Sequence, residues 1–313
     1  MIYYIKLIRP FNLLIIILTQ VLVRICILEP LLRINGSTAA LATWLWLLLI
    51  LATVMIAAAG YIINDILDIP LDKINKPGKI IIDTQISTSK AEIWYYIFNG
   101  MAIVVGAVVS FMIKKPTLTI IFIIIATLLY YYSYKYKYLT FWGNFSVSIL
   151  SAAVILIVWL FEFFSLKLDP EHFVESFKAF REINYFFVGY AAFAFLSSFI
   201  RELVKDTQDI EGDRRNGCRT IPVLLGIQKT RNIILLLNIF LLIAISFAQY
   251  LLFKHSPHAI AFSLIPAQLI ALLMILLIFR AKEKKDFYYL SQGYKILMIT
   301  GILSMISIPL SYS

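Results

Sequence analysis

Long apolar runs separated by short polar segments recur along the whole chain. Most are about 18 to 25 residues long, which is the length of helix that crosses a bilayer. The pattern predicts nine spanning helices, near residues 10–28, 41–63, 92–113, 117–134, 145–166, 184–204, 232–253, 258–279 and 289–310. Residues 167–181 are polar enough to be a loop or a short surface helix. The predicted fold is an all-α polytopic membrane bundle, in one domain that spans residues 1–313.

Composition and charge support this interpretation. The chain is 61% hydrophobic and 15% charged, whereas a soluble domain is nearer half apolar and a quarter charged. The net charge of +10 lies between the apolar runs, which favours contact with anionic lipid over nucleic acid. The first run follows Lys6 and Arg9 without a small-residue cleavage site after it, so we expect a membrane helix and no cleaved signal peptide.

The loops also predict an orientation. With nine spans, the N-terminus and the loops after the even-numbered helices share one side of the membrane, and that side holds most of the lysine and arginine. The positive-inside rule assigns it to the cytoplasm. We expect an integral protein of a bacterial inner membrane, with this side facing the cytoplasm.

One arrangement of acidic residues occurs twice, at the ends of the second and sixth runs. Each copy has aspartates at i, i+3 and i+7, a spacing that puts three carboxylates on one face of a helix. The two sets are Asp65, Asp68 and Asp72, and Asp206, Asp209 and Asp213. Both fall on the predicted cytoplasmic side, so we expect them to face each other.

This pattern is typical of a site for divalent metal and a polyanion. Mg²⁺ takes one or two carboxylates together with substrate phosphates, and it offsets charge on a departing diphosphate. The nearby loops supply basic residues that could bind the same anion: Lys73, Lys137, Arg201, Lys205 and Arg214. A diphosphate at the rim and hydrocarbon within the bundle together describe an isoprenyl diphosphate.

The sequence around the aspartates resembles that of the UbiA superfamily of intramembrane prenyltransferases. The resemblance covers essentially the whole chain. Asn64 and the first three aspartates, followed by Lys73, Asn75, Lys76 and Pro77, resemble the first signature of that family. Residues 205–214, followed by 219–222, resemble the second. Arg9, Pro10 and Asn12 resemble the opening of its first helix, and Tyr132 and Ser133, with Lys137 and Asn144 beyond, resemble its segment between helices 4 and 5.

The resemblance implies Mg²⁺-dependent transfer of a prenyl group from its diphosphate to an acceptor. It assigns Mg²⁺ to Asp65, Asp68, Asp206 and Asp209, with Asn64 as an additional ligand. Lys137 would help to bind the diphosphate during catalysis. The remaining candidates for substrate binding are Arg9, Asp72, Lys73, Asn144, Arg201, Lys205, Asp213 and Arg214.

The acceptor is predicted less directly. The sequence of residues 201–214 resembles that of the family members that transfer a geranylgeranyl group to geranylgeranylglyceryl phosphate. Aromatic prenyltransferases of the family share much of this sequence. Residues 79–87 depart from the family pattern, which commonly has Arg-Pro and Gly there. An aromatic acceptor (dihydroxynaphthoate, hydroxybenzoate or homogentisate) is therefore an alternative. An ion-coupled transporter is an alternative of another class, but carriers place charges near the midplane, whereas these aspartates lie at helix ends.

Overall fold

The computed structural model describes residues 2–75, 80–255 and 258–311. In this part of the chain helices are the only regular elements, apart from one isolated bridge between Ile82 and Ile86. Nine segments of it are long and apolar enough to cross a membrane: Pro10–Ile34, Thr43–Leu67, Thr88–Met112, Pro116–Tyr134, Trp142–Leu166, Pro170–Gln208, Ile221–Lys254, Ile260–Arg280 and Lys284–Leu310. The predictions of an all-α fold and of nine spans are confirmed.

The spanning segments are built from the following helices. The first consists of α2 (Pro10–Leu22), η1 (Val23–Leu28) and α3 (Glu29–Ile34), and the next five contain α4 (Thr43–Leu67), α6 (Thr88–Met112), α7 (Thr119–Tyr134), α8 (Trp142–Leu166) and α9 (Pro170–Gln208). The last three are formed by α11 (Ile221–His255), by α12 (His258–Phe262) with α13 (Ile265–Arg280), and by α14 (Lys284–Leu303) with η4 (Ser304–Ile306) and α15 (Ser307–Ser311).

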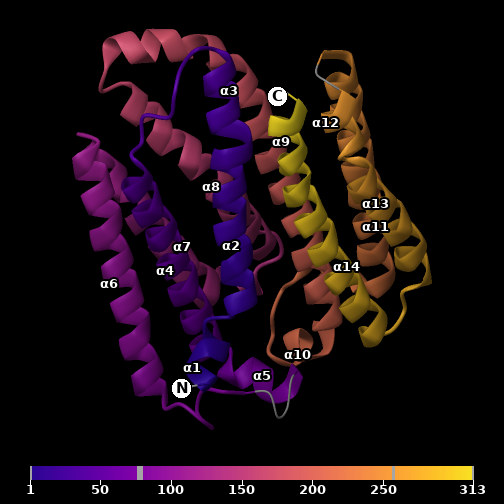
Figure 1. Cartoon of the computed structure of the whole chain (residues 1–313). Helices are drawn as coiled ribbons and strands as arrows, with labels where there is room; N and C mark the ends of the chain where they lie inside the picture. The colour runs from indigo at the N-terminus through magenta and orange to yellow at the C-terminus, as the bar shows by residue number, and fades with distance from the viewer. Residues whose placement is uncertain (1, 76–79, 256–257, 312–313) are drawn as a thin grey trace.

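Short helices mark one end of the bundle. Figure 1 shows α1 (Ile2–Leu7), α5 (Ile69–Asn75) and α10 (Ile210–Arg215) together at the end where the N-terminus lies. The C-terminus and α3 lie at the opposite end. We call these the N-terminal end and the C-terminal end of the bundle. Both acidic motifs are thus at the N-terminal end, on the side that the loop charges assign to the cytoplasm.

The buried core has two large parts that meet along α9. One is formed mainly by side chains of the first spans, such as Leu49, Phe161 and Phe187. The other is formed by α9, α11, α13 and α14, with Leu203, Met274 and Leu290 among its members. Because α9 contributes to both, it fixes the N-terminal half of the bundle against the C-terminal half.

The outer surface is apolar, as a bilayer requires. Along α11, Leu236, Phe240, Ile243 and Phe247 recur at helical spacing and are 60–67% exposed. A stripe of large exposed apolar side chains is costly in water and is favourable against lipid chains. The chain is therefore an integral membrane protein.

The segment before the sixth span differs from the prediction. Residues 170–181 belong to α9 itself, which runs for 39 residues instead of beginning near 184. Asp169 caps the helix by accepting from the backbone N–H groups of Glu171 at 3.0 Å and His172 at 3.3 Å, and Pro170 occupies its first position. Phe173 and Phe180 pack against Phe163 of α8. This capping and packing extend the spanning helix over a segment that was predicted to be a loop or a short surface helix.

A buried ion network fastens the C-terminal end. Arg24, in the π-helical η1, is 4% exposed and donates to the Glu29 carboxylate at 2.9 Å and to the Leu41 carbonyl at 2.8 Å. Glu162 of α8 is 1% exposed and accepts from the backbone N–H groups of Ala40 and Leu41. The turn before α4 is thus held by charged side chains of two neighbouring spans.

Candidate functional site

Each acidic motif breaks its helix at the middle aspartate. Asp68 ends α4 and precedes α5, and Asp209 ends α9 and precedes α10. The prediction that three aspartates share one face of a continuous helix is therefore wrong in its details, because the last aspartate of each set lies on the next short helix. The break is the same in both copies, so the pseudo-repeat read from the sequence extends to the backbone.

The two motifs meet at the N-terminal end of the bundle. Cα atoms of α5 and α10 approach to within 8 Å, and Figure 1 shows the two short helices side by side. Helix C-termini carry partial negative charge, and each junction adds carboxylates to one. Such a concentration of negative charge requires nearby cations, and the structure supplies them from several other elements.

Arg9 holds the first aspartate. Its guanidinium donates to the Asp65 carboxylate at 2.5 Å and lies over the Tyr61 ring, 4.9 Å from the ring centroid. Arg9 is the N-cap of α2 and has a left-handed backbone, with φ of 52°. Only a few per cent of residues other than glycine adopt positive φ, so this conformation indicates a position that its surroundings determine.

Lys137 holds the second aspartate. The Lys137 ammonium donates to Asp68 at 2.5 Å, and the Asn64 amide donates to the other oxygen of that carboxylate at 2.7 Å. Lys137 lies in η3 (Tyr136–Tyr138), against the start of α8. A Cβ atom on Gly143 would meet the Lys137 Cα at 2.8 Å, so this approach requires glycine.

The second motif is held by amides and hydroxyls. The Asn144 amide donates to Asp206 at 2.9 Å, and the Thr220 hydroxyl donates to Asp213 at 3.3 Å. Asp213 is only 7% exposed, and this burial, with the nearby Asp209 carboxylate, raises its pKa to about 6. The Arg219 backbone N–H also donates to the Tyr138 carbonyl at 2.8 Å, which joins the segment after this motif to the Lys137 turn.

Glu202 is a site residue that the sequence reasoning missed. It is 6% exposed and accepts from Arg201 at 2.9 Å and from Lys205 at 2.8 Å. Both predicted cations of α9 are therefore oriented by one carboxylate. The available signal was an acidic residue within an apolar spanning run, where charges are rare and usually functional.

Two predicted cations lie farther out. Lys73 is exposed and pairs with Asp83 at 3.8 Å, and Arg214 is exposed on α10. Asp72 lies partly exposed on α5. Within the stretch that departs from the family pattern, Ile82 and Ile86 are buried with Leu7, which anchors this loop to the bundle. Lys76, Pro77 and Lys79 lie outside the described residues.

The carboxylates have the chemistry that Mg²⁺ prefers, but they do not enclose a metal by themselves. In the described part of the chain, no three His, Cys, Asp or Glu side chains are grouped closely enough to hold an ion. Mg²⁺ in phosphate-transfer sites commonly takes one or two carboxylates, and substrate oxygens and water provide the rest. The donor set therefore fits Mg²⁺ that binds together with a diphosphate.

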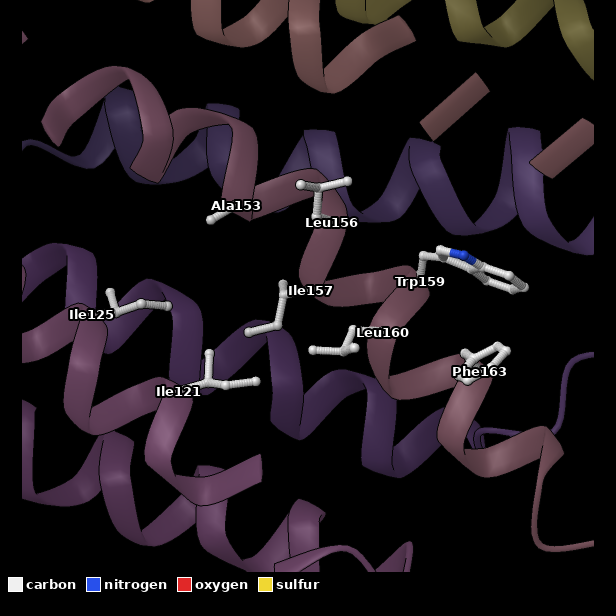
Figure 2. Close-up of a pocket in the computed structure, with 8 residues that line it drawn as sticks. All are labelled: Ile121, Ile125, Ala153, Leu156, Ile157, Trp159, Leu160 and Phe163. Carbon is white, nitrogen blue, oxygen red and sulfur yellow. The ribbon is translucent and has the colours of Figure 1, made fainter. Parts of the chain in front are cut away.

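An apolar cavity lies apart from this site. It has a volume of about 430 Å³ and is lined by side chains of α7 and α8: Ile121, Ile125, Ala153, Leu156, Ile157, Trp159, Leu160 and Phe163. Figure 2 shows only hydrocarbon and the indole ring around it. No residue of the acidic motifs lines this cavity.

Known proteins resemble this chain in both sequence and fold. The chain is 32% identical over 184 residues to the digeranylgeranylglyceryl phosphate synthase of Methanoregula boonei, a match that covers 59% of this chain and 58% of that relative. The chain thus spans less than two thirds of that relative's length. It is 26% identical to the synthase of Thermococcus gammatolerans over 264 residues, which cover 83% of this chain and 86% of the relative.

Solved structures extend the comparison to the whole chain. A structure of a digeranylgeranylglyceryl phosphate synthase superimposes with a TM-score of 0.64 and 25% identity, covering 98% of both chains. A UbiA homolog from Archaeoglobus fulgidus bound to GPP and Mg²⁺ shares the fold, with a TM-score of 0.61, 15% identity and coverage of 97% and 99%. Residues 33–297 match the sequence pattern of the UbiA prenyltransferase family. The chain belongs to this family.

Proposed function

We propose that this protein is a Mg²⁺-dependent prenyltransferase. It transfers a geranylgeranyl group from geranylgeranyl diphosphate to geranylgeranylglyceryl phosphate. The observation that carries the proposal is the junction of two acidic helix ends with Arg9 and Lys137 at one end of a membrane bundle. Such a junction suits a charged diphosphate, while the bilayer and the apolar bundle suit the hydrocarbon chains of both substrates.

In this proposal the aspartates and their hydrogen-bond partners have different roles. Asp65, Asp68, Asp206 and Asp209, with Asn64, would hold Mg²⁺. Bound Mg²⁺ would neutralise charge on the diphosphate as it departs. Arg9, Lys137 and Asn144 orient the carboxylates and bind the leaving group. The bond from the allylic carbon to the diphosphate breaks, the acceptor hydroxyl oxygen forms the new bond to that carbon, and the hydroxyl proton passes to the released diphosphate.

The named synthases support the choice of acceptor. Relatives with that name match the chain, and one solved synthase covers 98% of it. Arg201 and Lys205 precede Asp206 on α9 and add positive charge there. A phosphorylated acceptor would bring a second anion to these two residues. The aromatic acceptors carry a single carboxylate in place of a phosphate, so they would bring less negative charge to these residues.

We also propose a bacterial inner membrane as the location, with the acidic end facing the cytoplasm. The excess of lysine and arginine in the loops at this end supports the orientation. Single cysteines placed at Lys73 and at Glu175, on opposite ends of the bundle, provide a test. The Lys73 cysteine should resist a membrane-impermeant reagent in intact cells, and the Glu175 cysteine should react.

The acceptor is tested by incubating the purified protein, Mg²⁺ and radiolabelled geranylgeranyl diphosphate with separate acceptors. The panel comprises geranylgeranylglyceryl phosphate, dihydroxynaphthoate, hydroxybenzoate and homogentisate. The expected product is digeranylgeranylglyceryl phosphate alone. Prenylation of an aromatic acceptor without use of the glyceryl phosphate would contradict this acceptor and leave the family membership unchanged.

A further inference from the structure

A lysine that no acidic motif contains lies inside the ninth span. Lys295 is half-buried on α14, one turn after the buried Ser291, so both side chains are on one face of the helix. It is 11 residues beyond the first residue of α14, which corresponds to about 16 Å along the axis. Intramembrane lysines are rare, and they usually face a partner or a polar cavity.

The charged residues around Lys295 are mostly cations. It lies within electrostatic range of Arg9, Arg201 and Lys205, and Glu202 is the acid beside them. The packing of α14 against both α9 and α2 brings these residues together. Glu202 already accepts from Arg201 and Lys205, and no described carboxylate forms an ion pair with Lys295.

The charges in this cluster do not balance. Arg9, Arg201, Lys205 and Lys295 are four cations, whereas the carboxylates nearest to them are Glu202, the Asp65 partner of Arg9, and Asp206 beside Lys205. One positive charge is left over in a membrane-spanning part of the protein. The Arg201 Nε is also buried with no hydrogen-bond partner among the described residues. A phosphate monoester supplies negative charge and three acceptor oxygens, so it would offset the extra cation and give the Arg201 Nε a hydrogen-bond acceptor.

We propose that Lys295, with Arg201 and Lys205, binds the phosphate group of the acceptor. The inference rests on the proposed function, since it names the acceptor's charged group. The donor diphosphate has its partners at the two aspartate junctions, and Arg201 lies eight residues before Asp209, about 12 Å along α9. Two anions held at separate depths would leave the reacting carbon and hydroxyl oxygen between them.

The test is a steady-state comparison of Lys295→Met with the wild type. The acceptor KM is expected to rise about 10- to 100-fold, the range for a lost hydrogen bond to a charged group. The donor KM should stay within about twofold, and Lys295→Arg should recover most of the acceptor affinity. Lys285→Met is the matched control, because Lys285 is exposed near the start of the same helix. It should leave both KM values unchanged.

A phosphate-free acceptor supplies a second arm. Geranylgeranylglycerol should be a poor substrate for the wild type, and the preference for the phosphorylated acceptor should be about 10- to 100-fold smaller in Lys295→Met. A rise in donor KM that equals the rise in acceptor KM would assign Lys295 to the diphosphate and overturn the inference. An unchanged acceptor KM in an active enzyme would also overturn it, without affecting the proposed function.

Phosphate binding can be measured without turnover. In excess chelator, inorganic phosphate is expected to raise the melting temperature of the wild type and of Lys285→Met but not of Lys295→Met. This measurement distinguishes failure of the proposed acceptor from failure of the proposed Lys295 site. If the wild type does not use geranylgeranylglyceryl phosphate but shows the Lys295-dependent shift, only the proposed acceptor is contradicted. If phosphate protects all three proteins equally, the anion site does not involve Lys295.

Discussion

Three aspartates of the acidic motifs have different partners, so the carboxylates are not equivalent. Asp65 faces the guanidinium of Arg9, Asp68 faces the ammonium of Lys137, and Asp206 faces a neutral amide. A metal and a diphosphate that enter this site must compete with these bonds or share them. The partners therefore set which oxygens are available before substrate binds.

The aspartates at the first position of each motif are expected to be essential for turnover. Asp65→Ala or Asp206→Ala should lower the rate at least about 100-fold, because each removes a proposed metal ligand. Asp83→Ala is the control, since Asp83 is exposed and pairs only with Lys73 at 3.8 Å among the described residues. Transfer rates and melting temperatures of all three variants should be measured. Near-normal transfer by either motif variant would exclude its cluster as the metal site.

Asp213 is expected to make the metal-free protein sensitive to pH. Its pKa is about 6 in the folded protein and near 4 when unfolded, so the folded state loses stability as the pH rises through this interval. Asp213→Asn should therefore be more stable than the wild type at pH 8, by at most about 3 kcal/mol. The gain should shrink below pH 6.

Melting temperatures at pH 5 and pH 8 in excess chelator check this expectation. A gain for Asp213→Asn that is as large at pH 5 as at pH 8 would mean that the carboxylate charge is not its cause.

At the residue scale, the sequence locates the reactive groups but not their pairing. The aspartates, Lys137 and Asn144 could be named because polar residues at the ends of apolar runs stand out. The bond between Arg9 and Asp65 joins residues 56 positions apart, and it depends on how α2 packs against α4. Glu202 was overlooked because its role is visible only once Arg201 and Lys205 are seen to turn toward it.

At the element scale, the site depends on short connecting helices that hold side chains against one another. α5 and α10 bring the motifs together, and η3 presents Lys137 to Asp68. The η3 turn can approach α8 only because Gly143 has no side chain. Backbone packing thus controls the position of a proposed catalytic lysine.

Gly143→Ala should therefore impair transfer more than the addition of a single methyl group would suggest. The added Cβ would lie 2.8 Å from the Lys137 Cα and 3.0 Å from the Tyr136 carbonyl oxygen, so the turn must shift. A displacement of about 1 Å can lower a rate by up to 100-fold, and overpacking costs about 1–3 kcal/mol of stability. Gly100→Ala, on α6 with open space around its Cβ, should be harmless. Equal transfer by both variants would show that the position of Lys137 is not critical.

The ion network at the C-terminal end is expected to support stability and not chemistry. Glu162→Ala would leave the backbone N–H groups of Ala40 and Leu41 without their buried partner, so we expect a loss of about 3 kcal/mol. Transfer by the surviving folded protein should stay near the wild-type rate, because the aspartates lie at the other end. Glu175→Ala, an exposed position on α9, is the control. A large fall in transfer without a fall in melting temperature would contradict this role.

The sequence predicts the long elements well and the short ones poorly. Apolar length determines a spanning helix, which is why all nine spans could be located. Pro70, two residues beyond Asp68, lacks the N–H that a continuous helix would use, so the first break has a local signal. No proline lies beside Asp209, so nothing of that kind distinguishes the second break from continuous helix. The early start of α9 depends on ring contacts of Phe173 and Phe180 with Phe163, which only the folded bundle reveals.

At the scale of the whole molecule, α9 joins two halves that each supply one acidic motif. The first half ends its second span at Asp65 and Asp68, and α9 itself ends at the second motif. Because α9 packs in both parts of the core, the distance between the motifs is set by the whole bundle. The positive-inside pattern and the paired motifs could both be read from the sequence, whereas this shared packing could not.

The most direct test is the metal dependence of transfer by the purified protein. Wild-type protein is incubated with radiolabelled geranylgeranyl diphosphate and geranylgeranylglyceryl phosphate, either with Mg²⁺ or in excess chelator. If the two acidic helix ends hold a diphosphate through metal, transfer should be lost in chelator and should return when Mg²⁺ is restored. Full turnover in excess chelator would contradict the proposed site.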